Sequence, residues 1–413
     1  MNNNKKLCAT TDTKLRWKEI DFKKAEKRVK KLQIRLAEAY KEKNYKIVKN
    51  IQHLIIQSFS AKALAIKSVT TNKGCNTPGI DGIKWESDED KTNAIYSLNR
   101  KGYKSNTLKR IYIPKSNGKY RALSIPTMQD RAMQTLYKFA LEPIAEINAD
   151  EHSYGFRPKI GVINAIEYCK DTLEKNPQIK WFLKVDIKSC FDNISHEWLM
   201  ENVFMDKEIL KKFLKSPYMY RKKLYQTISG VPQGGTISSV LCNIALDGLE
   251  RLLVDKYGNN IFMIRYADDI LILGIEPQLL VQCVVPIINE FLSERNLELA
   301  EEKTKLVSIS QGITFLGWEL CKVRKNVVLT PAKSNIKIFE DKINKEFLIG
   351  KEMPNDEKIK RIVNGWLGFY GRLSEETVLY GVRDKIISVA NSYGHSKIAD
   401  EISELFGKFF TND

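Results

Sequence analysis

Residues 262–273 read Phe-Met-Ile-Arg-Tyr-Ala-Asp-Asp-Ile-Leu-Ile-Leu, so two adjacent aspartates separate two apolar runs. Runs of this length and composition are typical of buried β-strands. Asp268 and Asp269 are therefore expected at or near a hairpin turn. Adjacent carboxylates repel each other and lose solvation when buried, and a hard divalent cation relieves both costs. A solvated Asp-Asp turn without a metal is the alternative for this pair taken alone.

A third acid ends another predicted strand. Residues 181–187, Trp-Phe-Leu-Lys-Val-Asp-Ile, indicate a buried strand with Asp186 near its end. Two strands of one sheet can bring Asp186 within a few ångströms of Asp268 and Asp269. Three carboxylates suit two hard cations, which together activate the attacking oxygen and stabilise the leaving group in phosphoryl transfer. Because acids within apolar strands are otherwise costly, the metal site is the favoured interpretation.

The balance of charged residues indicates what kind of partner carries the phosphate. The 413 residues include 67 Lys plus Arg against 50 Asp plus Glu, a net charge of +17. This excess favours a polyanion, either nucleic acid or an anionic membrane. No apolar run approaches the ~20 residues that span a bilayer, and residues 1–6 are too polar for a signal peptide. We therefore expect a cytoplasmic protein with a nucleic-acid partner and no membrane. The seven scattered cysteines and four histidines predict no zinc site.

The order of periodic segments predicts three parts. Residues 1–70 form a basic helical extension whose charged face is either solvated or turned to RNA. Residues 71–330 mix helices with strands, among them a hairpin over 109–126, a helix over 237–254 and a strand over 314–318. Residues 331–413 are helical and basic, and Pro331 marks their start.

The Tyr-Ala-Asp-Asp sequence at 266–269 resembles the palm motif of reverse transcriptases. Other blocks follow in that family's order: 115–121 resembles the fingers hairpin, 186–191 the first palm motif, 232–234 the motif beneath the nucleotide, 299–305 the block after the palm hairpin and 315–318 the primer grip. The resemblance implies an α+β right-hand polymerase fold. Its fingers and palm (71–330) contain an antiparallel palm sheet packed by helices, and its thumb or maturase-like region (331–413) is all-helical.

The resemblance also implies roles for individual residues. Asp186, Asp268 and Asp269 are catalytic, and with the backbone carbonyl of Ile187 they bind two Mg²⁺ ions, which Mn²⁺ can replace. The residues expected to contact the nucleotide are Lys115, Arg121, Phe191, Gln233, Gly234 and Lys303. Those expected to contact primer or template are Tyr266, Arg157, Gly317 and Trp318. Phe191 is the aromatic that excludes ribonucleotides by clashing with the 2′-hydroxyl.

Several of these residues also have structural alternatives. Phe191 and Tyr266 suit a protein core, Gln233 suits a turn, and Lys115 and Arg121 suit an exposed hairpin tip.

Further blocks narrow the resemblance to bacterial group II intron-type reverse transcriptases. They are residues 16–21, 77–82, 153–158 and 365–370. The chain departs from the intron enzymes in three ways: Ala122 follows Arg121, Thr-Ile-Ser-Ser occupies 236–239 in place of Pro-Leu-Ser-Pro, and no Cys/His-rich endonuclease tail follows the thumb. The expected form is therefore a compact, stand-alone enzyme.

We expect an RNA-directed DNA polymerase that copies a dedicated structured noncoding RNA in bacterial antiviral defence. Its partners would be the RNA template, a DNA primer or cDNA product, and deoxynucleoside triphosphates. Two alternatives stay open: a group II intron maturase that acts as an RNA-binding splicing factor, and a retron-type enzyme primed from its own RNA.

Overall fold

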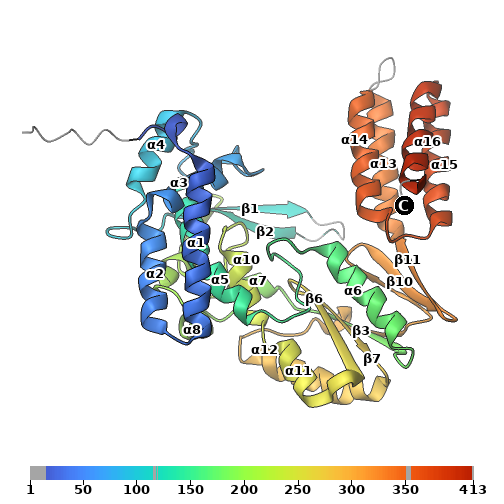
Figure 1. Ribbon diagram of the computed structural model, residues 1–413, viewed down its shortest axis with the longest axis horizontal. Coiled ribbons are helices and arrows are strands. Elements are labelled where there is room, and N and C mark those ends of the chain that lie inside the picture. The colour runs from blue at the N-terminus through green and yellow to red at the C-terminus, as the bar shows by residue number, and fades with distance from the viewer. Residues whose placement is uncertain (1–14, 115–117, 119, 350–354, 412–413) are drawn as a thin grey trace, which may run out of the picture. The chain divides into compact units, whose positions relative to one another are not determined.

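The computed structural model describes residues 15–114, 118, 120–349 and 355–411 (Figure 1). It divides into two compact units. The first comprises Met1–Ala149, Ser189–Asp247 and Ser293–Leu297, and the second comprises Asp150–Lys188, Gly248–Leu292 and Glu298–Asp413. Lys115 lies outside the described residues. The three-part division expected from the sequence stays a proposal.

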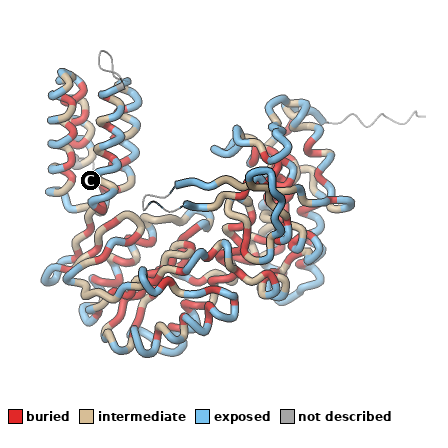
Figure 2. The backbone as a smooth tube through the Cα atoms, turned by 180° about the vertical axis from the view of Figure 1, so that it is seen from behind, coloured by how far each residue is buried: buried red, intermediate tan, exposed pale blue. Residues whose placement is uncertain are grey.

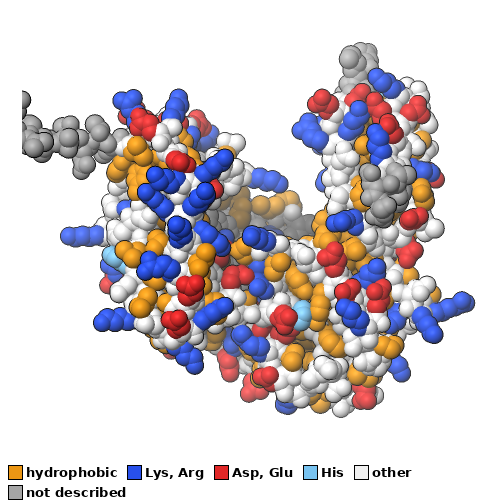
Figure 3. Space-filling view, in the orientation of Figure 1, with side chains coloured by type: hydrophobic (Ala, Val, Ile, Leu, Met, Phe, Trp, Pro, Cys, Tyr) orange, Lys and Arg blue, Asp and Glu red, His pale blue; other side chains and the backbone are white. Residues whose placement is uncertain are grey.

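Amphipathic helices dominate the first unit. A short 3₁₀ turn (Trp17–Glu19) precedes α1 (Phe22–Lys41), α2 (Tyr45–Gln57) and α3 (Phe59–Thr71), and all three helices pack on α5 (Met128–Asn148). The side chains of Asp21, Asn44 and Ser58 accept backbone hydrogen bonds at the three N-termini, which fixes where each helix begins. Lys and Arg side chains gather on the outer face of these helices (Figure 3).

A four-stranded sheet completes the first unit. Its order is β2 (Tyr120–Ile125), β1 (Leu108–Pro114), β4 (Tyr218–Tyr220) and β5 (Lys223–Tyr225). The predicted β1–β2 hairpin is confirmed, whereas the β4–β5 hairpin was not predicted. The remaining helices of this unit are α4 (Asp88–Ser97), α7 (Cys190–Asn193), α8 (His196–Asn202), α9 (Lys207–Leu214) and α10 (Ser238–Leu246).

Asp186 and Asp269 belong to a sheet in the second unit, here called the acidic sheet, and Asp268 lies in one of its turns. Its order is β6 (Ile261–Tyr266), β7 (Asp269–Gly274), β3 (Trp181–Asp186) and β8 (Lys305–Ser308), all antiparallel. Both predicted acid-bearing strands are confirmed. The helices α6 (Val162–Lys175) and α11 (Leu249–Tyr257) pack against β6. A π-helical turn (Leu279–Val284) leads into α12 (Val285–Ser293).

A second sheet and four helices share the hydrophobic core of this unit. The sheet runs β9 (Ile313–Phe315), β10 (Trp318–Val323) and β11 (Asn326–Pro331). The helices are α13 (Lys333–Ile349), α14 (Asp356–Tyr370), α15 (Glu376–Ser392) and α16 (Ser396–Thr411). Buried positions recur along their inner faces (Figure 2), and one continuous core joins Phe182 of the acidic sheet to Trp318 and Phe406.

Two sequence predictions about these elements are wrong. The helix expected over 237–254 is two helices, because Gly248 has a φ of +98° and the Asp150 carboxylate accepts the backbone N–H groups of Gly248 and Glu250. The strand expected over 314–318 is broken by a turn in which Leu316 and Gly317 have φ values of +50° and +85°.

Candidate active site

Asp186 and Asp269 occupy paired positions on adjacent strands. Antiparallel pairing of β3 with β7 sets Asp186 directly opposite Asp269, the last residue of one strand against the first of the other. Directly opposed side chains have their Cβ atoms about 4.5–5.5 Å apart, and like charges there destabilise a sheet. The register thus concentrates negative charge at the end of a pair of strands that is apolar apart from Lys184.

Asp268 lies in the two-residue turn between β6 and β7. The preceding Ala267 is buried and has a φ of +57°, a left-handed conformation that costs free energy for any residue with a side chain. The neighbouring segment 153–155 holds this turn in place. Tyr154 N–H donates to the Arg265 carbonyl at 2.8 Å, and a Cβ on Gly155 would lie 2.2 Å from Ala267 N. Only glycine fits this position without moving the turn.

Two lysines hold the opposed carboxylates. Lys303 Nζ donates to Asp186 Oδ1 at 2.8 Å, and the contact raises the pKa of Lys303. Lys184 Nζ lies 3.6 Å from Asp269 Oδ1 and also donates to the Thr314 carbonyl at 3.0 Å. Lys184 was not among the predicted site residues. Its position two residues before Asp186 puts it on the same face of the strand, a signal that the sequence already carried.

Burial raises the pKa of Asp269 to about 6, and the charges of Asp268 and Asp186 add to this rise while Lys184 opposes it. Asp269 Oδ1 is buried, and Lys184 Nζ lies 3.6 Å from it, which is beyond hydrogen-bond distance. Three carboxylates share two lysines here, so the site keeps an excess of negative charge, as expected where a cation binds.

The donor set fits a hard divalent cation. Three carboxylates offer oxygen ligands. Ile187 faces Leu299 in an antiparallel bridge, and the two hydrogen bonds of this bridge are made by the residues on either side of Ile187. The Ile187 carbonyl takes no part in these hydrogen bonds. In the part of the chain that the structure describes, no three His, Cys, Asp or Glu side chains converge to hold an ion as they stand. Lys184 and Lys303 each contact one oxygen of a carboxylate that would bind the ion.

Four of the predicted nucleotide contacts lie in the first unit. Gln233 and Gly234 pack on β2: the Gln233 carbonyl accepts from Ser124 N–H at 2.7 Å, and a Cβ on Gly234 would meet the Ser124 carbonyl at 2.6 Å. The Phe191 carbonyl accepts from Val231 N–H at 2.7 Å, and Arg121 is exposed on β2. Phe191, Gln233 and Gly234 are thus joined by one loop, whereas Lys303 lies beside Asp186 in the second unit.

The predicted primer and template contacts lie in the second unit, in different environments. Tyr266 is half-buried opposite Asp269, whereas Trp318 is fully buried in the core. Arg157 Nη1 donates to the carbonyls of Asp150 and Ser153. The Gly317 carbonyl accepts from Ala332 N–H at 2.9 Å and from the Tyr370 hydroxyl at 3.2 Å. Trp318 therefore offers no side-chain surface for a primer in this conformation.

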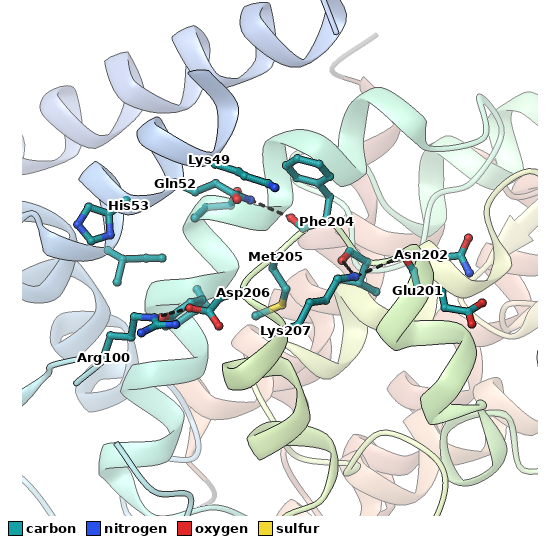
Figure 4. Close-up of a pocket in the computed structure, with 14 residues that line it drawn as sticks. Lys49, Gln52, His53, Arg100, Glu201, Asn202, Phe204, Met205, Asp206 and Lys207 are labelled. Carbon is teal, nitrogen blue, oxygen red and sulfur yellow. Dashed lines mark hydrogen bonds and ion pairs between the residues drawn. The ribbon is translucent and has the colours of Figure 1, made fainter. Parts of the chain in front are cut away.

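A cavity of about 470 Å³ in the first unit has none of these residues in its lining (Figure 4). It is bounded by α2, α5 and residues 201–207. Gln52 Nε2 donates to the Phe204 carbonyl at 2.9 Å. Arg100 forms an ion pair with Asp206, and Lys207 Nζ donates to the Val203 carbonyl at 2.6 Å. Most of its polar groups are thus engaged with the protein itself.

Comparison with known families decides the assignment. Residues 113–320 match the model for reverse transcriptase (RNA-dependent DNA polymerase), and residues 17–98 match that for the N-terminal domain of reverse transcriptase. The chain belongs to the reverse transcriptase family. This membership confirms the expected α+β right-hand polymerase fold. Within the described residues, no helix is both long and apolar enough to cross a membrane.

Several of the curated proteins that the chain resembles are encoded by introns. It is 30% identical to protein YkfC of Escherichia coli over 308 residues, which cover 63% of this chain and 80% of YkfC. It is 34% identical to the group II intron-encoded protein LtrA of Lactococcus lactis over 200 residues, 46% of this chain and 33% of LtrA. A COX1/OXI3 intron 2 protein of Saccharomyces cerevisiae is 26% identical over 67% of this chain, which spans 38% of that protein.

Proposed function

We propose that the chain is an RNA-directed DNA polymerase that extends a DNA primer on an RNA template. The observation that carries the proposal is the register of Asp186 opposite Asp269, with Asp268 in the adjoining turn, within a chain of the reverse transcriptase family. Mg²⁺ ions bound to these carboxylates and to the Ile187 carbonyl would activate the primer hydroxyl and stabilise the leaving pyrophosphate.

The protein's own residues would prepare this chemistry. Lys184 and Lys303 would partly neutralise the carboxylates until a bound cation takes over this role. Lys303 would then be free to bind the negatively charged triphosphate. Arg121 would add positive charge from the fingers hairpin, and Lys115 is proposed for the same role. Gln233 and Gly234 would support the base, and Phe191 would exclude the ribose 2′-hydroxyl. Tyr266, Arg157 and the backbone at Gly317 and Trp318 would contact primer or template.

The test compares two purified double variants with the wild type. Asp268→Ala with Asp269→Ala should abolish extension of a DNA primer on RNA while leaving RNA binding and thermal stability near wild type. The control, Asp171→Ala with Glu174→Ala, removes two exposed carboxylates from α6 and should extend the primer normally. Wild-type extension by the first variant would refute the assignment.

For the template, we propose a dedicated structured noncoding RNA copied in antiviral defence. The net charge of +17 supports an RNA partner. A splicing role is the second candidate, favoured by the similarity to a group II intron-encoded protein. Sequencing the RNA and DNA that copurify with the protein separates the two: intron RNA without cDNA supports splicing, whereas one noncoding RNA with its cDNA supports the first proposal.

A further inference from the structure

Five tyrosines share one face of the sheet formed by β2, β1, β4 and β5. In the antiparallel β1–β2 pair, Pro114 lies opposite Tyr120 and Tyr112 lies opposite Ala122. In the parallel β1–β4 pair, Leu108 lies beside Tyr218. Since directly paired residues project to the same side and alternate residues of a strand share a face, one face carries a set of tyrosines together with Arg110 and Lys223. These tyrosines, called here the tyrosine face, are Tyr112, Tyr120, Tyr218, Tyr220 and Tyr225.

The tyrosine face is already built as a stack. Tyr218 and Tyr225 are stacked with centroids 5.2 Å apart and ring planes within 11°, and the Arg110 guanidinium lies 3.9 Å from the Tyr218 centroid. Tyr112 and Tyr220 meet edge to face at 4.9 Å. The outermost rings stay open to solvent: Tyr120 is 66% exposed and Tyr225 is 40% exposed. A further planar group can therefore extend the stack.

Arg110 has no carboxylate partner among the described residues, and its Nε is a buried donor without an acceptor. No residue of the four strands is acidic. An arginine that is stacked on tyrosine and lacks an anion is suited to a phosphate beside a stacked base.

The β4–β5 turn adds two cations at the edge of the tyrosine face. Arg221 and Lys222 connect the strands with φ values of +48° and +65°. A two-residue turn with both φ values positive normally takes Asn-Gly, because side chains with a Cβ are strained there. Arg221 also lies 5.2 Å from the centroid of the Tyr220 ring, and local strain of this kind is typical of functional sites.

These features together describe a binding surface for a single strand. Aromatic rings offer each base a stacking surface regardless of sequence, and adjoining cations follow the phosphates. The surface is distinct from the expected nucleotide contact, because Arg121 pairs with Ile113 and projects to the opposite face of the sheet. A protein partner would be matched less well, since an exposed cluster of cations without acids is costly to desolvate.

We propose that the tyrosine face and the Arg221–Lys222 turn bind single-stranded RNA by base stacking and phosphate contact. The proposal rests on the proposed polymerase function for its biological meaning, as a site for unpaired template. RNA binding by the tyrosine face does not depend on catalysis, so binding measurements alone test it.

The first test removes the turn cations without harming the turn. Arg221→Asn with Lys222→Gly installs the residues that the turn geometry prefers, so thermal stability should be unchanged or higher. Binding of a fluorescein-labelled, unstructured RNA of about 20 nucleotides is measured in EDTA by anisotropy over a series of salt concentrations. The slope of log K against log salt should become shallower by about 1.4, since each lost contact with a single strand contributes about 0.7.

The charge control is Arg324→Asn with Lys325→Gly, which removes two cations from the β10–β11 turn. It should leave the RNA affinity near wild type. Equal loss of affinity in both double variants would show that only net charge matters and would overturn the proposal.

The second test separates stacking from charge. Tyr225→Ser and Tyr112→Ser should each weaken RNA binding by about 5- to 150-fold, the range for loss of one stacked base. Leu224→Ser changes an exposed residue of the same strand on the opposite face, 55% exposed, and should have no effect. Wild-type affinity in both tyrosine variants would overturn the proposal, as would a change of oligomeric state by sedimentation with RNA affinity unchanged, because that marks a protein interface.

Primer extension by the same samples keeps the two proposals separate. Loss of RNA binding in the tyrosine variants supports the inference even if the wild type makes no DNA. Unchanged RNA binding refutes it even if the wild type is an active polymerase.

Discussion

Asp186 lies directly opposite Asp269 in the acidic sheet, and a separate lysine holds each carboxylate: Lys303 holds Asp186 and Lys184 holds Asp269. Two opposed acids weaken a strand pair, so the arrangement does not serve sheet stability. It forms a compact anionic site in which two lysines partly offset three carboxylates until a cation arrives. The lysines therefore compete with the metal, and their removal should be measurable in metal binding.

We expect Lys303→Ala to increase the affinity of the apoprotein for Mn²⁺ by about two- to fivefold, the range for removing an exposed ion pair. Mn²⁺ binding is followed by electron paramagnetic resonance without nucleotide. The neighbouring exposed Lys305→Ala is the control and should leave the affinity as in wild type. The same Mn²⁺ affinity in wild type and Lys303→Ala would show that Lys303 does not compete.

We expect Gly155→Ala to displace the turn that carries Asp268, because the new Cβ would lie 2.2 Å from Ala267 N. Unfolding free energy should fall by about 1–3 kcal/mol, as for other overpacked sites, and the polymerisation rate should fall further than this alone explains. Urea denaturation and single-turnover primer extension measure the two effects. Gly161→Ala adds a Cβ with no atom within 4 Å and should be close to wild type.

We expect stability to fall as the pH drops below about 6.5, in part because of His196. Burial lowers the pKa of His196, and its Nε2 donates to the Gly230 carbonyl at 2.8 Å. The unfolded chain takes up a proton near its ordinary pKa of about 6.5 while the folded chain resists it, so stability present above that pH is lost on acidification. Urea titrations from about pH 8 to about pH 5 should show a smaller loss for His196→Gln than for wild type. Equal losses would exclude His196 as a cause.

We expect Phe191→Ala to raise incorporation of ribonucleotides relative to deoxyribonucleotides by one to two orders of magnitude, about the discrimination that sterics provide against one hydroxyl. Extension of a single primer with ATP or dATP gives the ratio, and the dATP rate monitors general damage. If the ratio matches wild type while dATP incorporation is retained, Phe191 does not exclude the ribose.

The acid-bearing strands were predictable because their apolar runs determine both the element and the position of each aspartate. Their register was not, since the sequence alone does not show that Asp186 pairs with Asp269 and not with a neighbour. Interruptions of helices that depend on residues far away in the sequence could not be predicted either. The interruption before α11 depends on Asp150, which is 98 residues from Gly248. The β4–β5 hairpin was missed because its strands have three residues each and its turn contains Arg221 and Lys222 in place of glycine or asparagine.

One continuous core joins Phe182 to Trp318 and Phe406, so we expect the C-terminal helices and the acidic sheet to unfold together. Backbone amides of β3 and of α16 should therefore become accessible to hydrogen exchange through the same global opening. A chain cut at the start of α13 would expose the apolar side of the second sheet. Through this core, the helices contribute to the persistence of the three aspartates' geometry.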